Sequence, residues 1–240
     1  MKKILLIIPA YNEEENILKT YNSIVNYNKN NKLKYDIIVI NDGSKDNTQK
    51  ILEENIIPHI NLINNLGIGG AVQTGYKYAH YHNYDIAVQF DGDGQHDVRY
   101  VKNIIEPIID DKADLVIGSR FIENIDTFKS SLSRRIGIKI ISIFIKLATG
   151  EKIYDTTSGF RACNKEIIKF FAESYPTEYP EPLTTAEIIK KKYRVSEVPV
   201  EMNEREGGVS SIRSWKGAYY MINVLLSLII IKLRRYKKCR

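Results

Sequence analysis

Cysteine is scarce in this sequence, and charge is balanced outside its C-terminal end. Cys163 and Cys239 are the two cysteines among 240 residues, and their separation argues against a disulfide framework or a zinc site and for a reducing compartment. The net charge is +6, and residues 232–240 alone carry six positive charges and no acid. The remainder is neutral and lacks the basic stripe and stacking aromatics of a nucleic-acid groove, so we expect no nucleic-acid partner.

Several familiar binding motifs are also missing. The glycine-rich segment 67–71 lacks the Gly-Lys-Ser/Thr of a Walker loop, and Val72 stands where a dinucleotide fingerprint needs Gly or Ala. The segment is either a tight turn or a backbone that approaches something closely, at a helix N-terminus able to receive phosphate. An EF-hand at the Asp-Gly-Asp-Gly sequence is excluded, because Gln95, His96 and Lys102 stand where ligands or glycine are needed.

A signal peptide is not predicted at the N-terminus. The apolar run at residues 4–8 is too short, and Pro9 and three glutamates follow where a cleavage site would lie. We expect this run to be the first strand of a sheet. The sequence also shows no internal repeat and no low-complexity linker.

The chain does contain a regular alternation of strand-like and helix-like segments. Apolar runs of strand length are followed by helical patterns of about ten to fifteen residues, which indicates βαβ units and a mainly parallel sheet. The predicted strands are residues 3–8, 35–40, 59–63, 85–90, 114–118 and 194–200, and the predicted helices include residues 14–27, 130–149 and 166–171. We therefore predict an α/β fold, as one large domain or a domain with an appendage.

The strand predicted at residues 85–90 ends in Asp91-Gly92-Asp93-Gly94. Two carboxylates one residue apart at a strand end converge on one point, and like charges raise each other's pKa unless a cation lies between them. Oxygen ligands of this kind suit Mg²⁺ or Mn²⁺, which bind a few carboxylates together with substrate phosphates. The alternative is a solvated turn, because Asp-Gly pairs are common turn formers.

Three of the predicted strands end in polar, acid-bearing loops. Tyr11 and Glu13 follow the first strand, Asp42 follows the second, and Asp91 and Asp93 follow the fourth. In open α/β sheets, ligands bind beyond the carboxyl ends of the strands. The coincidence predicts one binding crevice at this edge of the sheet rather than three unrelated turns.

The second half of the chain contains two strongly apolar helical segments. Residues 130–149 carry isoleucines on more than one face, which fits a core helix or a helix that rests on a membrane. Residues 217–231 are uncharged and would form about 22 Å of helix, shorter than the roughly 30 Å hydrocarbon core of a membrane. This helix could lie at an interface, cross with help from snorkelling Lys232 and Arg234, or pack against a partner.

The basic tail indicates which face of the membrane the protein would contact. Anionic lipids of the cytoplasmic leaflet attract lysine and arginine, so we expect the protein at the cytoplasmic face of the cell membrane, either peripheral or C-terminally anchored. We divide the chain into a catalytic domain at residues 1–212 and a membrane-associated helix with a basic tail at residues 213–240.

Seven short stretches, in order along nearly the whole chain, resemble one family. They are residues 9–13, 41–44, 65–71, 91–96, 118–121, 155–161 and 205–211, which read PAYNE, NDGS, NLGIGGA, DGDGQH, GSRF, DTTSGFR and REGGVSS. With them the chain resembles the family 2 glycosyltransferases of the GT-A fold, a Rossmann-like sheet flanked by helices. It is most similar to their polyprenyl-phosphate sugar synthases of the dolichyl-phosphate mannose synthase type. Any one stretch is weak evidence, whereas seven in register are specific.

The resemblance implies a donor site for a nucleotide sugar, either a UDP-sugar or a GDP-sugar. The residues that would form this donor site are Pro9, Tyr11, Glu13, Ile40, Asp42, Asp91 and Gly92. The residues that would lie at a Mg²⁺ or Mn²⁺ ion bridging the diphosphate are Asp91, Asp93 and Gln95. The mannosyl synthases place a lysine six residues after an arginine that Arg205 matches, and this chain has Ser211 there, so the donor stays open.

The catalytic residues implied are Asp93, Arg120, Arg205 and Glu181. Arg120 and Arg205 would meet phosphates of the donor or the acceptor and, with the metal, stabilise the departing nucleoside diphosphate. A lipid monophosphate has a second pKa of about 6 and needs no general base. A hydroxyl acceptor would need one, and Glu181, in a proline-bounded loop, is the candidate.

We favour inverting, metal-dependent transfer of a sugar to polyprenyl phosphate, because the apolar helices and the basic tail would accommodate a lipid. One alternative is transfer to a sugar hydroxyl of a cell-surface glycan, and another is a catalytically idle scaffold, which would have no need for a charged crevice. A processive polymer synthase is not expected, because the Gln-x-x-Arg-Trp motif is absent. A small membrane protein or a second copy of the chain are further candidate partners.

Overall fold

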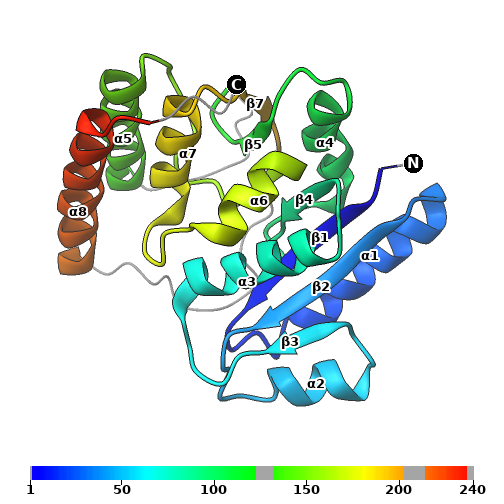
Figure 1. Ribbon diagram of the computed structural model, residues 1–240. Helices are drawn as coiled ribbons and strands as arrows, with labels where there is room; N and C mark the ends of the chain where they lie inside the picture. Colours follow the sequence, from blue (N-terminus) through cyan, green and yellow to red (C-terminus); the bar gives the residue numbers. More distant parts are fainter. Residues whose placement is uncertain (1, 123–131, 203–213, 237–240) are drawn as a thin grey trace.

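Strands and helices alternate along the chain, as the sequence pattern predicts (Figure 1). The computed structural model describes residues 2–122, 132–202 and 214–236. The strands are β1 (Ile4–Ala10), β2 (Tyr35–Asn41), β3 (His59–Asn61), β4 (Ile86–Gln89), β5 (Leu115–Ser119), β6 (Arg161–Asn164) and β7 (Val195–Pro199). The helices are α1 (Ile17–Asn31), α2 (Thr48–Glu54), α3 (Gly67–Tyr81), the 3₁₀ turn η1 (Val98–Tyr100), α4 (Val101–Ile109), α5 (Leu132–Thr149), α6 (Lys165–Glu173), α7 (Pro180–Lys190) and α8 (Ser214–Leu233).

The strands of the described residues form one sheet in the order β3-β2-β1-β4-β6-β5-β7. Neighbouring strands are parallel except at β6, which runs antiparallel to both β4 and β5. The prediction of an α/β fold with a mainly parallel sheet is confirmed. The strand β6 is absent from the predicted set, because its four residues begin with an arginine and are too few for an apolar run of strand length.

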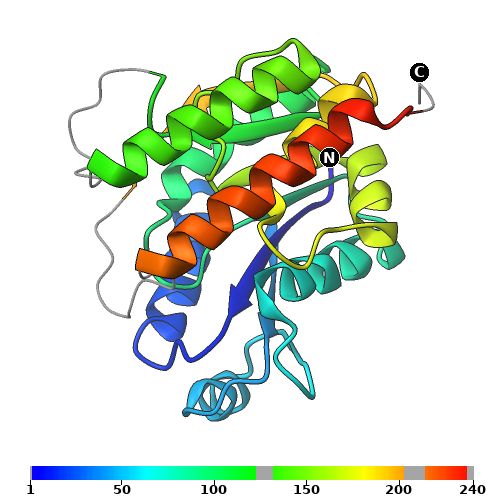
Figure 2. The ribbon, with the colours of Figure 1, turned by 90° about the vertical axis from the view of Figure 1, so that its left-hand side faces the viewer.

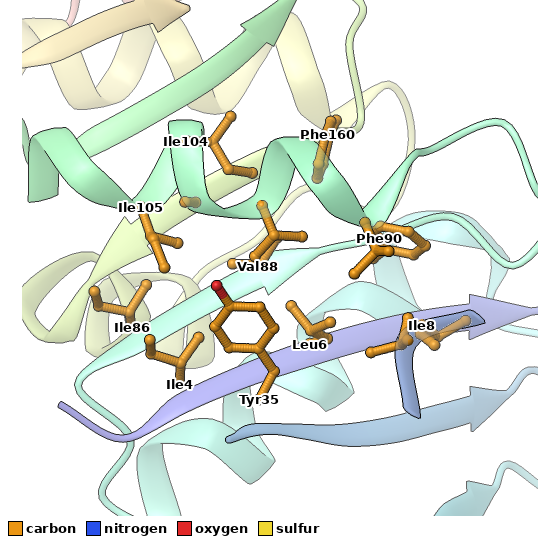
Figure 3. Close-up of a cluster of buried hydrophobic side chains, with 14 of the residues drawn as sticks. Ile4, Leu6, Ile8, Tyr35, Ile86, Val88, Phe90, Ile104, Ile105 and Phe160 are labelled. Carbon is orange, nitrogen blue, oxygen red and sulfur yellow. The ribbon is translucent and has the colours of Figure 1, made fainter. Parts of the chain in front are cut away.

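Alternation along β1 builds a core on both faces of the sheet. Ile4, Leu6 and Ile8 join one buried cluster with residues of α1 and α4, whereas Leu5 and Ile7 join a second cluster with residues of α3 and α6. Figure 3 shows the first cluster, with Ile104 and Ile105 of α4. Side chains of successive strand residues point to opposite faces, so both clusters need the same register. Each fully buried Ile or Leu contributes roughly 1.5–3 kcal/mol, which makes the central strands a firm platform for the loops at their ends.

A third cluster lies beside β5 and is built by helices α5, α7 and α8. It includes Ile117 of β5, Ile141 and Ile145 of α5, Ile189 of α7 and Leu228 of α8. Figures 1 and 2 show α5 and α8 side by side at this end of the molecule. One face of α8 therefore packs against the rest of the fold. Among residues 2–122, 132–202 and 214–236, no helix has both the length and the hydropathy required to cross a membrane.

Candidate functional site

The carboxyl ends of β1, β2 and β4 lie at one edge of the sheet. Parallel registers align β1 with β2 on one side and with β4 on the other. The loops that begin at Tyr11, Asp42 and Phe90 therefore leave the sheet in the same direction. This confirms the prediction that three polar loops share one edge.

His96, at the far end of the same loop, bonds to the backbone of Asp91 and lies close to its carboxylate. His96 Nδ1 accepts a hydrogen bond from the Asp91 backbone N–H at 2.9 Å, and His96 Nε2 lies 3.4 Å from Asp91 Oδ2. Because Nδ1 accepts, the ring proton is on Nε2 and faces the carboxylate. The buried ring stacks on Phe160 at 4.6 Å and meets the edge of Phe90. Burial lowers the pKa of His96 to about 3, so the ring is neutral at physiological pH.

The rest of this loop is held from several sides. Thr20 of α1 donates from Oγ1 to the Gly92 carbonyl at 3.1 Å, and the Gln95 backbone N–H donates to Asp93 Oδ1 at 3.0 Å. A Cβ added at Gly159 would lie 3.3 Å and 3.4 Å from the two carboxylate oxygens of Asp91. A glycine at residue 159 therefore leaves the space that the Asp91 side chain occupies.

Asp42 is buried at the end of β2 and bonds to the beginning of α3. Its Oδ1 accepts from the backbone N–H of Leu66 at 2.7 Å. Burial raises the pKa of Asp42, and the backbone N–H groups of Leu66 and Gly67 oppose that shift. One carboxylate oxygen is thus used to fix the loop that leads into α3.

The glycine-rich segment 67–71 begins helix α3, and its close approach is to the protein itself. A Cβ at Gly69 would lie 2.2 Å from the Pro176 carbonyl oxygen and 2.5 Å from that of Thr177. A Cβ at Gly75, farther along α3, would lie 2.1 Å from Ile7 of β1. Close backbone approach, one of the two interpretations left open by the sequence, is observed at Gly69, and its partners are residues 176–177.

The other predicted donor residues differ in what they expose. Ile40 is fully buried, and Pro9, its partner in the register of β1 and β2, is also buried. These two residues therefore present backbone atoms, not side chains, to a ligand at the strand edge. Tyr11 is 42% exposed. Glu13 lines an open hollow of about 390 Å³ together with Lys45 and neighbouring residues.

Arg120 follows β5 and is buried in an ion pair. Its Nε and Nη2 donate to the two carboxylate oxygens of Asp155 at 2.7 Å and 2.8 Å, and Nη2 also reaches Thr157 Oγ1 at 3.1 Å. Asp155 is itself placed by Glu197, which accepts from the Asp155 backbone N–H at 2.7 Å. A bidentate pair of this kind fixes the plane of the guanidinium.

The prediction of a loop around Glu181 is wrong. Helix α7 begins at Pro180, because proline has a backbone angle suited to a helix start and no N–H to satisfy there. Glu181 therefore lies in the first turn of this helix. The Glu181 side chain lies near the Gln89 side chain. Burial raises the pKa of Glu181, Arg161 opposes the rise, and Asp91 adds to it. Glu181 is thus close enough to Asp91 for the two charges to interact.

Two residues that the sequence did not single out support this corner. Gln89 ends β4, and Arg161 begins β6 directly opposite it. Arg161 is fully buried and donates to the Glu181 carbonyl at 2.9 Å, to Thr184 Oγ1 at 3.2 Å and to the Ser158 carbonyl at 2.7 Å. An arginine within an otherwise apolar segment is the one sequence signal that could have indicated a buried polar cluster.

The predicted residue Arg205 lies outside the described residues. The chain that leads to it does reach the site, because Met202 forms an isolated antiparallel bridge with His96. Among the described residues, no group of three or more His, Cys, Asp and Glu side chains is placed to hold a metal by itself.

The sequence is similar to several proteins of known or named activity. It is 38% identical over 220 residues to the UDP-N-acetylglucosamine–dolichyl-phosphate N-acetylglucosaminyltransferase of Methanococcus voltae, covering 83% of this chain and 85% of the relative. It is 26% identical over 233 residues to the undecaprenyl-phosphate mannosyltransferase of Micrococcus luteus, covering 92% of each chain.

The fold matches that of glucosyl-3-phosphoglycerate synthase from Mycobacterium tuberculosis, in a crystal structure with Mn²⁺, uridine diphosphate and phosphoglyceric acid. The TM-score is 0.69 at 16% identity, over 96% of this chain and 78% of the other. This likeness confirms the predicted GT-A fold. The family model described as glycosyl transferase family 2 matches residues 5–171. The chain belongs to glycosyl transferase family 2.

Proposed function

We propose that the protein is an inverting, metal-dependent glycosyltransferase that moves a sugar from a UDP- or GDP-sugar to a polyprenyl phosphate at the cytoplasmic face of a membrane. The observation that carries the proposal is the shared strand edge, where Asp91 and Asp93 follow β4 and the Glu181 carboxylate is close enough to interact with the charge of Asp91. Relatives named for dolichyl and undecaprenyl phosphate support a lipid phosphate acceptor.

The residues of the Asp91–His96 loop fit a divalent cation. Asp91 and Asp93 offer carboxylate oxygens and Gln95 an amide oxygen, and Mg²⁺ or Mn²⁺ binds to one or two carboxylates together with substrate phosphates. The structurally similar synthase was crystallised with Mn²⁺ and uridine diphosphate. When bound, such a cation would neutralise the charge that develops on the departing diphosphate.

The loop that carries these side chains is held by the rest of the protein. His96 bonds to the backbone of Asp91 and lies close to its carboxylate, and Thr20 fixes the turn at Gly92. Pre-positioned ligands cost no reorganisation during the reaction. The exposed ring of Tyr11 offers a face on which the base of the donor could stack, with Asp42 and Glu13 on the adjoining loops.

Glu181 is proposed to meet the sugar of the donor. Its carboxylate is close enough to Asp91 for the two charges to interact, and therefore lies near the proposed diphosphate site. An ionised carboxylate accepts hydrogen bonds from sugar hydroxyls, so Glu181 would orient the sugar while the acceptor attacks from the opposite side. Arg120, fixed by Asp155, and Arg205 are proposed to meet phosphates at this edge.

Helices α5 and α8 offer a surface for the lipid. On α5 the exposed apolar side chains are Ile136, Ile140, Ile143 and Leu147, and on α8 they include, besides Tyr219 and Ile230, the series Ile222, Leu226, Ile229 and Leu233. In both helices the spacing is four, three and four residues, which forms a stripe along one face. Exposed Lys232, Arg234 and Arg235 follow the α8 stripe. Apolar stripes followed by cations suit an anionic membrane surface.

A second candidate function is transfer to a sugar hydroxyl. The observation that favours it is the raised pKa of Glu181, because a carboxylate with a raised pKa is a better general base. Removing a general base typically costs 10²–10⁴-fold in rate, whereas a phosphate acceptor needs none. Glu181→Gln therefore separates the two functions.

The test is a donor panel. The purified protein is incubated with radiolabelled UDP- and GDP-sugars, Mn²⁺ and polyprenyl phosphate, and label is counted in the organic phase. We expect one sugar nucleotide to label the lipid and the product to have the inverted anomeric configuration. Donor binding without label in the lipid for every sugar nucleotide would overturn the proposal.

A further inference from the structure

The residue that precedes helix α7 has an unusual backbone. Tyr179 adopts φ 52° and ψ 49°, the left-handed region. That region is disfavoured for a bulky side chain, and a residue that precedes proline normally takes an extended backbone. Tyr179 is followed by Pro180, so both preferences are violated at once. A backbone of this kind persists only where surrounding contacts hold it, and such positions cluster at functional sites.

The contact that holds Tyr179 comes from helix α8. The rings of Tyr179 and Tyr220 meet edge to face, with centroids 4.6 Å apart and an interplanar angle of 80°. Both rings pack against the third buried cluster, between α5, α7 and α8. An edge-to-face pair has a preferred geometry, so Tyr220 restrains where the ring of Tyr179 can lie.

The other side of this turn is fixed from the sheet. Arg161 donates to the Glu181 carbonyl at 2.9 Å, and Thr185 Oγ1 donates to the same oxygen at 2.7 Å. Arg161 thus fixes the backbone of Glu181 on one side. On the other side, Tyr220 restrains Tyr179, which lies two residues before Glu181. From this position the Glu181 side chain is near enough to Gln89 and Asp91 to interact with both.

We propose that Tyr220 of α8 is a positioning residue for Glu181, acting through the left-handed backbone of Tyr179. The inference rests on the proposed contact of Glu181 with the donor sugar. It links the helix that carries the exposed apolar stripe to the reacting end of the donor. Losing the Tyr220 ring lets Tyr179 relax toward the extended backbone, which turns the start of α7 and moves the Glu181 carboxylate.

The test compares Tyr220→Ala with Tyr220→Phe and Tyr219→Ala. Phe keeps the edge-to-face ring, and Tyr219 is a neighbouring tyrosine of α8 that is 61% exposed. Turnover is measured with a water-soluble, short-chain polyprenyl phosphate, so that membrane contact does not enter. Donor affinity is measured separately by calorimetry, and circular dichroism verifies the fold. The same substitutions are repeated in a Glu181→Ala background.

We expect Tyr220→Ala to lower kcat about tenfold with little change in donor affinity, and the two control variants to match the wild type. In the Glu181→Ala background the effect of Tyr220→Ala should disappear, because residues that act through one group are not additive. A tenfold loss that persists in that background, or a Tyr220→Ala enzyme as fast as wild type, would overturn the inference.

A second variant tests the inference in case Tyr220→Ala does not fold. Tyr179→Gly accepts the left-handed backbone without strain but removes the ring, so it should also lower kcat in the wild-type background and not in Glu181→Ala. If Tyr220→Ala unfolds, this variant decides the matter. If Glu181→Ala itself leaves turnover unchanged, the proposed role of Glu181 fails and the inference with it. If Glu181→Ala is slow while both tyrosine variants are normal, the inference alone fails.

Discussion

The strand edge and the cluster of helices α5, α7 and α8 differ in which groups they bury and which they expose to water. At the edge, polar groups are taken out of water and bonded: Asp42 accepts from Leu66, and Asp91 is held by His96. In the helical cluster, apolar side chains are left in water, among them Ile143 at 53% and Ile222 at 58% exposure. The first region is suited to a charged ligand, and the second is suited to an apolar surface outside the protein.

This difference indicates where the nucleotide donor and the lipid acceptor of the proposed reaction would meet. A nucleotide donor is small and charged and needs fixed oxygen and N–H groups, which parallel strand ends supply. A polyprenyl chain needs apolar area and little directional bonding. Glu181 lies at the boundary, because its helix α7 packs on α8 while the charge of its side chain interacts with that of Asp91.

The largest expected effect comes from breaking the strand edge. Asp93→Asn removes one of two carboxylates proposed to hold the cation, and we expect transfer to fall by roughly 10³-fold, the scale of losing electrostatic stabilisation of a leaving group. The fold should be retained, because like-charge repulsion is relieved. Asp110→Asn, which affects an acid paired with Lys112 on the surface, is the control. Unchanged turnover of Asp93→Asn at saturating metal would contradict the assignment.

The buried histidine His96 gives the free energy of unfolding a pH dependence. Its folded pKa of about 3 lies below the ordinary value of 6.5, so between these values the unfolded chain binds a proton that the folded protein does not. The free energy of unfolding should therefore fall as the pH drops from 6.5 toward 3, by up to about 1.4 kcal/mol per pH unit. Urea melts of wild type and His96→Phe at pH 7 and pH 4.5 measure this, and equal losses in both would contradict it.

The same substitution tests the edge as a metal site. His96→Phe keeps a ring to stack on Phe160 but removes both contacts to Asp91. Groups that orient metal ligands are worth about 10–100-fold in affinity, so Mn²⁺ binding, followed by electron paramagnetic resonance without substrate, should weaken at least tenfold. His80→Phe, on helix α3, is the control. Equal Mn²⁺ affinity in all three proteins would show that His96 serves packing alone.

The smallest effect is expected on the helical side. Leu226→Ser removes one apolar side chain that is 54% exposed on α8, so membrane partitioning should fall about fivefold, since only part of the roughly 1.5–3 kcal/mol for a full leucine is at stake. Ile63→Ser, at a residue that is 97% exposed elsewhere, is the control. Flotation with vesicles of anionic phospholipid measures both. Equal partitioning of the two variants would move the membrane contact away from α8.

The two regions also differ in how far the sequence predicts them. The strand edge follows from local patterns, because an apolar run that stops at Asp91 or Asp42 marks both a parallel strand and its ligand-facing end. The corner around Glu181 does not follow in this way. Its helix start depends on a left-handed Tyr179, and its support depends on Arg161 in a short antiparallel strand. Both are products of contacts between segments distant in sequence, which propensity and periodicity do not encode.

The central claim is that a lipid phosphate at the strand edge accepts the sugar. The most direct measurement offers wild type and Glu181→Gln the same radiolabelled donor with polyprenyl phosphate, polyprenol of equal chain length, or a glycan. We predict label in polyprenyl phosphate alone, with Glu181→Gln slowed by less than about tenfold, because a dianionic phosphate needs no general base. Transfer to the glycan or to polyprenol that is abolished in Glu181→Gln would contradict the account.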